Sequence, residues 1–232
     1  FAGYIVTTQN SGTESVDTPF TLTITPTDAY GNTQTTGATN GQINFTTNAT
    51  NSPDAVAPSF SVANEILNLT GGAQTTTITA TQTNAGETPT VTATDSGNGA
   101  INGTTSVITV TPGAETSLRV TGTASVNAGD SNELTITAKD QYGNTATGYA
   151  GDKSLTFTGP TVAPAGNVAT VETVNAGSAT TVNFIAGASS GTNATLIAYN
   201  AETVEVDVTD GSVNSTGDVA HDLDLTVSPG NL

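Results

Sequence analysis

The 232-residue chain contains no cysteine, methionine or tryptophan, and it has a single histidine. Without cysteine it has neither a disulfide framework nor a thiolate metal site. Long apolar runs are also missing, so no segment reaches the length needed to span a bilayer. The sequence carries no nucleophile elbow, phosphate-binding loop, histidine-based zinc motif or dinucleotide-binding fingerprint. We therefore expect neither an enzyme nor a membrane-spanning protein.

Basic residues are scarce as well. Lysine and arginine together number three, and aspartate and glutamate together number 20, which gives a formal net charge of -17. Such a charge repels nucleic acid and anionic membrane surfaces. It favours divalent cations or basic partners, or it simply keeps molecules apart in solution.

Threonine supplies about a fifth of the chain, and 25 residues are glycine. A composition rich in β-branched and turn-forming residues, without helically spaced aliphatic runs, is typical of many short strands. We predict an all-β chain. The absence of methionine and the scarcity of basic cleavage points suit a protein outside the cell, and the lack of cysteine does not exclude secretion, so we expect an extracellular or cell-surface location.

One stretch of the sequence occurs twice. Residues 22–33, Leu-Thr-Ile-Thr-Pro-Thr-Asp-Ala-Tyr-Gly-Asn-Thr, return as Leu-Thr-Ile-Thr-Ala-Lys-Asp-Gln-Tyr-Gly-Asn-Thr at 134–145. Alternating aliphatic and threonine residues predict a half-buried strand. Aspartate, glycine and asparagine then favour a turn, because they bond locally or accept left-handed geometry. The predicted turn residues are Asp28, Gly31, Asn32, Asp140, Gly143 and Asn144.

A repeat of more than a hundred residues is a whole domain. We predict one β-sandwich over residues 1–112 and a second over 113–211, each built from about seven short strands separated by turn signals. The junction is the proline-containing segment 111–115. Residues 212–232 are predicted to form a linker and a C-terminal strand.

The C-terminal strand has two candidate registers. In the first, residues 223–230 match 106–113 and form the last strand of the second domain. In the second, residues 204–208 are the last strand, and 221–227 form a surplus strand. The even spacing of strands favours the second register. A surplus strand with Leu223, Leu225 and Val227 on one face could pair with a neighbouring subunit.

The repeated turn and its surroundings resemble a known family. In the second copy the turn is followed by Ala-Thr-Gly-Tyr-Ala-Gly at 146–151, and a Val-Thr-Pro-Gly-Ala junction precedes a Leu-x-Val strand. These features are similar to the bacterial and archaeal immunoglobulin-like (Big or invasin-like) repeats of surface adhesins, surface-layer proteins and extracellular filaments. The resemblance implies two tandem immunoglobulin-like β-sandwich domains. The first copy departs from the pattern after its turn, where the second tyrosine is missing.

Calcium is the one cofactor that the acidic residues suggest, since it takes six to eight oxygen ligands. Each repeated turn offers only two side chains, which favours a plain turn over a metal site. A richer candidate is the C-terminal group of carboxylates. A charged edge that discourages unwanted pairing explains this group equally well. Its members are Asp207, Asp210, Asp218, Asp222 and Asp224.

Other reactive residues point to surface roles. His221 has only strand neighbours as partners, which favours a surface residue over a catalytic one. Lys139 and Lys153 could form an isopeptide crosslink with an asparagine, but a solvated lysine is favoured. Six sequons would become glycan sites only in an exported chain, at Asn44, Asn48, Asn68, Asn102, Asn193 and Asn214.

These expectations combine into a non-enzymatic structural protein, a subunit of a cell-surface filament or layer. We expect copies of the chain to be its partners and strand edges to join them, with donor-strand exchange as one mode. The donated strand would be the C-terminal one or the apolar N-terminal one, with Phe1, Tyr4 and Val6. The alternatives are an adhesin repeat that binds a host protein or glycan through its loops, and a carbohydrate-binding accessory of a secreted enzyme.

Overall fold

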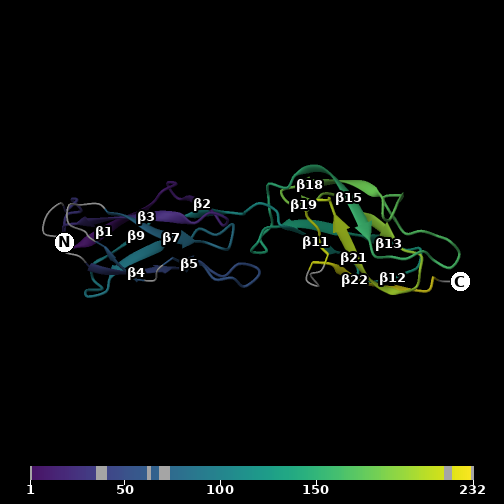
Figure 1. Cartoon of the computed structure of the whole chain (residues 1–232), viewed down its shortest axis with the longest axis horizontal. Helices are drawn as coiled ribbons and strands as arrows, with labels where there is room; N and C mark the ends of the chain where they lie inside the picture. Colours follow the sequence, from purple (N-terminus) through teal and green to yellow (C-terminus); the bar gives the residue numbers. More distant parts are fainter. Residues whose placement is uncertain (1, 35–40, 62–63, 68–73, 217–220, 231–232) are drawn as a thin grey trace. The chain divides into compact units, whose positions relative to one another are not determined.

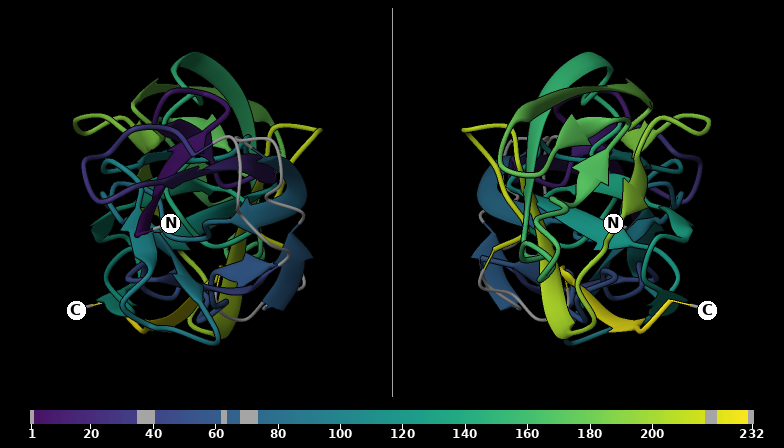
Figure 2. Two further views of the ribbon diagram at one scale, coloured as in Figure 1. Left: turned by 90° about the vertical axis from the view of Figure 1, so that its left-hand side faces the viewer. Right: turned by 90° about the vertical axis from the view of Figure 1, so that its right-hand side faces the viewer.

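The computed structural model describes residues 2–34, 41–61, 64–67, 74–216 and 221–230. In these ranges the chain consists of strands and loops, without a helix (Figures 1 and 2). It divides into two compact units, one of Phe1–Gly113 with Tyr142–Asn144 and one of Ala114–Gln141 with Thr145–Leu232. The prediction of an all-β chain with two sandwich domains is confirmed. Nothing in the described part is a helix long and apolar enough to cross a membrane.

The first unit is a sandwich of two four-stranded sheets with a short parallel pair beside them. One sheet has the order β1 (Gly3–Thr8), β3 (Phe20–Thr27), β7 (Gln74–Thr81), β5 (Ser59–Phe60). The other has the order β6 (Asn64–Leu67), β4 (Gly41–Thr47), β8 (Val91–Asp95), β9 (Asn102–Thr104). The parallel pair joins β2 (Thr13–Ser15) to β10 (Thr109–Thr111).

The alternation that predicted a half-buried strand is realised in β3. Phe20, Leu22 and Ile24 are fully buried, and the threonines between them are half-buried. They pack in one core with residues of the opposite sheet, among them Ile43 and Val91. Since burying each large aliphatic or aromatic side chain contributes about 1.5–3 kcal/mol, this face dominates the cohesion of the unit.

The second unit has an eight-stranded and a four-stranded sheet. The larger has the order β11 (Ser117–Thr121), β14 (Thr135–Lys139), β19 (Ala188–Ser189), β18 (Ala179–Ile185), β15 (Gly151–Thr158), β21 (Thr203–Thr209), β22 (Leu223–Ser228), β12 (Ser125–Asn127). The smaller has the order β13 (Ser131–Glu133), β20 (Thr195–Ile197), β16 (Thr170–Val171), β17 (Val174–Asn175). Both contribute to one continuous core.

The C-terminal strand belongs to the second unit, which corrects the favoured register. β22 pairs antiparallel with β21, from Val206–Leu223 to Thr203–Thr226, and parallel with β12. Both of its edges are therefore occupied inside its own sandwich. The three side chains proposed for donation, Leu223, Leu225 and Val227, are buried in the core of this unit. The surplus-strand interpretation was wrong, because these alternating aliphatics complete their own domain.

Candidate functional site

The first repeated turn is held closed by its aspartate. Asp28 Oδ1 accepts hydrogen bonds from the backbone N–H groups of Tyr30 (2.8 Å) and Asn32 (2.9 Å), and Asn32 Nδ2 donates to Asp28 Oδ2 at 3.0 Å. Gly31 supplies the left-handed residue, with φ of 83°. Donation from Asn32, first by its side chain and then by its backbone, holds the pKa of Asp28 below its usual range. Both carboxylate oxygens are thus used by the turn itself.

The second turn uses the same residues differently. Gly143 again takes a positive φ, of 78°, while Asp140 and Asn144 are buried. Asn144, which belongs to the first unit, donates from Nδ2 to the Thr83 carbonyl at 3.0 Å and accepts at Oδ1 from the Ala85 N–H at 2.9 Å. A buried amide that satisfies two backbone groups fixes the chain around residues 83–85. The sequence signalled a turn here but not this second role.

Tyr149, part of the motif that follows the second turn and one of three tyrosines that a carbohydrate-binding role would need on the surface, is instead a core residue of the second unit. Tyr149 is 1% exposed and stacks edge-on against Phe184, with ring centroids 4.8 Å apart. Its hydroxyl donates to Asp210 Oδ2 at 2.8 Å. The ammonium of Lys153 lies 4.2 Å from the centre of the ring, a cation–π arrangement. Lys153 is thereby placed as a partner of Tyr149.

Asp210 is shared between this tyrosine and its own loop. Its Oδ1 accepts from the backbone N–H groups of Ser212 (2.8 Å) and Val213 (2.9 Å). Burial alone would raise the pKa of Asp210, but these bonds and the one from Tyr149 outweigh it and hold the pKa below its usual range. Burial, followed by the bond to Asp210, raises the pKa of the Tyr149 hydroxyl.

The described members of the predicted calcium group lie in different environments. Asp210 serves Tyr149, and Asp207 accepts from Ser215 Oγ at 3.2 Å. Asp207 and Asp224 line a shallow hollow of about 380 Å³ with Glu205, and Glu205 is the direct cross-strand neighbour of Asp224. Across the ranges that the structure covers, no group of three or more acidic, histidine or cysteine side chains is placed to hold a metal ion. Asp218 lies outside the described residues, so calcium binding stays a prediction.

The sequons fall in both exposed and half-buried positions. Asn48, Asn102 and Asn214 are exposed, whereas Asn44 and Asn193 are half-buried. Asn68 lies outside the described residues. Glycosylation stays a prediction, and the exposed sites are the ones that an oligosaccharide could reach without unfolding the sheet.

The predicted N-terminal strand lies at an edge of the first unit. Tyr4 and Val6 of β1 are buried in that unit's core, at 6% and 3% exposure, while Phe1 lies outside the described residues. β1 pairs with β3 along its whole length, from Gly3–Thr27 to Thr8–Leu22. Its apolar side chains therefore serve its own sandwich.

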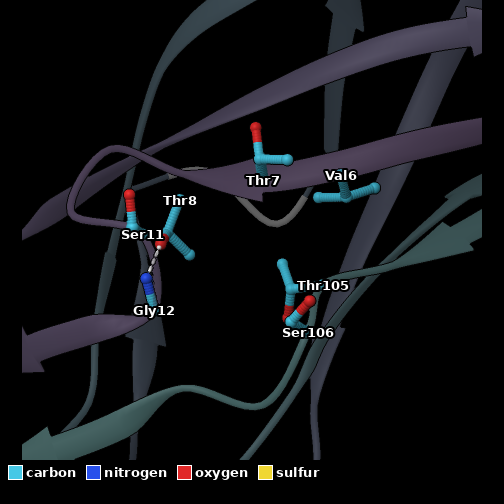
Figure 3. A pocket seen from close by; sticks show the side chains of 7 residues that line it. All are labelled: Val6, Thr7, Thr8, Ser11, Gly12, Thr105 and Ser106. Atoms are coloured by element: carbon cyan, nitrogen blue, oxygen red, sulfur yellow. Dashed lines mark hydrogen bonds between the residues drawn. The ribbon is translucent and has the colours of Figure 1, made fainter.

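A hollow of about 410 Å³ opens beside the end of β1 (Figure 3). Its walls carry hydroxyl and methyl groups and no ionisable side chain. The one hydrogen bond drawn there runs from the Gly12 N–H to Thr8 Oγ1, at 2.9 Å. The lining residues are Val6, Thr7, Thr8, Ser11, Gly12, Thr105 and Ser106. Such a lining suits contact with main chain or neutral side chains, not acid–base chemistry.

Comparison with known proteins yields similarity to solved structures only. No family model matches the chain, and no curated protein matches it. Invasin, a bacterial integrin-binding protein, is similar at 17% identity and a TM-score of 0.44, covering 97% of this chain and 40% of its own. A glycosyl hydrolase family 2 member from Bacteroides cellulosilyticus gives 13% identity and a TM-score of 0.36, covering 90% of this chain and 23% of its own.

The fibronectin(III)-like modules of Clostridium thermocellum CbhA give 12% identity and a TM-score of 0.24, covering 97% of this chain and 95% of their own. This chain spans less than half the length of invasin and of the glycosyl hydrolase. At such identities the likeness concerns the fold alone. The function therefore has to be argued from this chain's own residues.

Proposed function

We propose that this chain is a non-enzymatic structural part of an extracellular or cell-surface protein, which bears tension along the chain and associates with its own copies through strand edges. The observation that carries the proposal is a parallel strand pair in each unit. β2, near the start of the first unit, pairs parallel with β10, its last strand. In the second unit β12 pairs parallel with β22, again the last strand.

Parallel pairing of an early and a last strand sets how a domain responds to pulling. Force on the two chain ends draws two parallel neighbours in opposite directions along their length. The hydrogen bonds between them are then loaded together in shear, whereas the bonds of a terminal hairpin would open one after another. In the first unit the Thr109 N–H donates to the Gly12 carbonyl at 2.7 Å, and the Val16 N–H donates to the Thr111 carbonyl at 3.1 Å.

The second unit repeats the arrangement with different residues. Its Thr226 N–H donates to the Ala124 carbonyl at 2.8 Å, and its Ala128 N–H donates to the Ser228 carbonyl at 2.8 Å. Two sandwiches that share this parallel pairing of an early and a last strand suit a stalk, layer or filament. The absence of methionine and the scarcity of lysine and arginine suit an exported chain.

Single-molecule pulling on the two chain ends tests the tensile role. We expect two unfolding peaks, one for each unit. Thr109→Pro removes one shear-loaded donor and should lower the first unit's peak alone, since proline lacks an N–H. Thr226→Pro should lower only the second unit's peak, so each variant carries its own internal control. If neither variant lowers its unfolding peak, these strand pairs do not resist force. Negative-stain electron microscopy of native material is a separate test, which shows whether copies of the chain assemble.

One observation favours the adhesin alternative. Tyr30, in the first repeated turn, is 91% exposed. Tyrosine is a preferred anchor of protein recognition, so this side chain is available to contact a partner. If the chain is a binding module, Tyr30→Ala should abolish its attachment to host cells. Asp28 and Asn32 would keep the turn closed in that variant, so its fold would serve as the control. Attachment that survives the substitution would contradict this alternative.

A further inference from the structure

One edge of the first unit carries unpaired backbone groups. β1 is an outer strand, and the Gln9 N–H donates to the Thr21 carbonyl at 3.2 Å at the end of its ladder with β3. Pairs in an antiparallel ladder alternate between hydrogen-bonded and non-hydrogen-bonded. By this alternation Ile5 and Thr7 face β3 with their backbone groups, while Val6 and Thr8 direct their N–H and C=O groups to the outer side.

The chain that could cover this outer side turns away before it reaches Val6. At Gly103 of β9 the approach to the Tyr4 carbonyl is so close that no Cβ would fit. Beyond it, the Thr105 N–H bonds the Val91 carbonyl at 2.9 Å and the Ile108 N–H bonds the Pro89 carbonyl at 2.7 Å. These bonds hold residues 105–108 toward the opposite sheet. The hollow of about 410 Å³ lies in the gap between residues 6–8 and residues 105–106 (Figure 3), and within the described part of the chain no backbone hydrogen bond links Val6 or Thr8 to residues 105–108.

The surface around the gap is neutral on a strongly acidic molecule. Residues 1–13 and 96–114 contain no charged side chain, although the chain carries a net charge of -17. Glu14, the first charged residue, is buried at 2% exposure. Two apolar side chains lie on the segments that border the gap, Ile5 at 47% and Val107 at 61% exposure. A molecule with the same acidic surface can therefore approach here without the repulsion that it meets elsewhere.

We propose that two copies of this chain pair through this edge, antiparallel, with Thr7 on the two-fold axis. In that register Val6 lies opposite Thr8 of the second copy, and Thr8 lies opposite its Val6. In each of these two pairs the residues exchange two backbone hydrogen bonds. The contact is therefore self-complementary, as a two-fold interface requires. The occupant is a second copy because this register satisfies the same four groups on each side and because the edge is neutral. This pairing rests on the proposed function, in which copies associate through strand edges, and it identifies the outer side of β1 as the edge that they use.

A cysteine substitution reads this register directly, because the chain has no cysteine of its own. Thr7 would face Thr7 of the second copy in a non-hydrogen-bonded pair, with Cα atoms about 4.5 Å apart, inside the range of a disulfide. Under mild oxidation Thr7→Cys should give about tenfold more disulfide dimer than Ile5→Cys. Ile5 is exposed on the same face of the same strand. In this register it faces Gln9 of the second copy, so residue 5 of one copy lies too far from residue 5 of the other to form a disulfide.

A second pair of variants tests the backbone bonds without a crosslink. Thr8→Pro removes an outward N–H together with the side-chain acceptor of the Gly12 N–H, whereas Thr8→Ala removes that acceptor alone. Only the proline variant should reduce self-association in sedimentation velocity, while the circular dichroism of both stays unchanged. Equal crosslinking of Thr7→Cys and Ile5→Cys, or none in either folded variant, would overturn the pairing. If crosslinking is equal or absent but electron microscopy still shows assemblies, the proposed function stands and the contact lies on another strand edge.

Discussion

Replacing Gly159 with alanine is expected to destabilise the second unit by at least about 3 kcal/mol, enough to unfold much of a marginal domain. Gly159 follows the end of β15 and has a φ of 118°, a backbone conformation that side chains disfavour. Its α-carbon lies so close to the Glu205 main chain that an added Cβ would collide with that carbonyl oxygen. Relief requires β15 and β21 to separate, although they are paired between Phe157 and Val208.

Gly166 provides the matched control for this substitution. It has a φ of 89°, but no atom lies within 4 Å of the position that a Cβ would take. Gly166→Ala should cost only the conformational penalty, about 1–2 kcal/mol. Urea denaturation followed by circular dichroism would compare the variants, with the transition of the first unit as a reference inside each molecule. Similar losses in both variants would show that the collision with Glu205 does not decide the effect.

The fold was predictable because its signal is local. Leu22 and Ile24 in the first copy and Leu134 and Ile136 in the second alternate with polar residues, and all four are buried. Composition alone excluded long helices. The turn residues were also predictable, since Asp28 and Gly31 act through bonds and dihedral angles within five positions of sequence.

The register of the last strand was misjudged because spacing was weighed above burial. Leu223, Leu225 and Val227 alternate perfectly, and a strand with three aliphatics on one face needs a core. Treating it as surplus would have exposed all three in the isolated chain. The pairing partners of that strand, β12 and β21, are separated from it or from each other in sequence. The register could still have been chosen correctly from the burial argument and from the match of residues 223–230 to 106–113.

The remaining sites depend on contacts that no local pattern encodes. The bond from Tyr149 to Asp210 joins residues 61 positions apart. The gap beside β1 exists because residues 105–108 bond to Val91, the first residue of β8, and to Pro89 just before it, which a single sequence does not reveal. Acidic residues that are near one another in sequence, such as Asp207 and Asp210, were expected to act together, but Asp207 bonds Ser215 and Asp210 bonds Tyr149.

Tyr149 is expected to be the most sensitive aromatic position of the second unit. Tyr149→Ala should cost about 4 kcal/mol, because it leaves a cavity against Phe184 in a close-packed core. Tyr149→Phe keeps the ring and loses only the bond to Asp210, which is charge-assisted and contributes about 1.5 kcal/mol. Tyr4→Phe is the counterpart in the first unit, where the hydroxyl lies 3.3 Å from Asp95 Oδ2, so its cost should be smaller. Equal costs for the two phenylalanine variants would contradict this ranking.

The Tyr149 hydroxyl and the Asp210 carboxylate, which share a hydrogen bond, should affect stability in different pH ranges. The folded pKa of Asp210 lies below its ordinary value of 3.8, so its contribution is present above that value and is lost as the pH falls toward the folded pKa. The folded pKa of Tyr149 lies above its ordinary value of 10.0, so the unfolded chain loses that proton first and stability falls as the pH rises above 10. Tyr149→Phe should flatten the alkaline fall of the second unit's unfolding free energy while its acid fall persists, because Ser212 and Val213 still donate to Asp210. An unchanged alkaline profile in this variant would show that the hydroxyl is not the group that titrates.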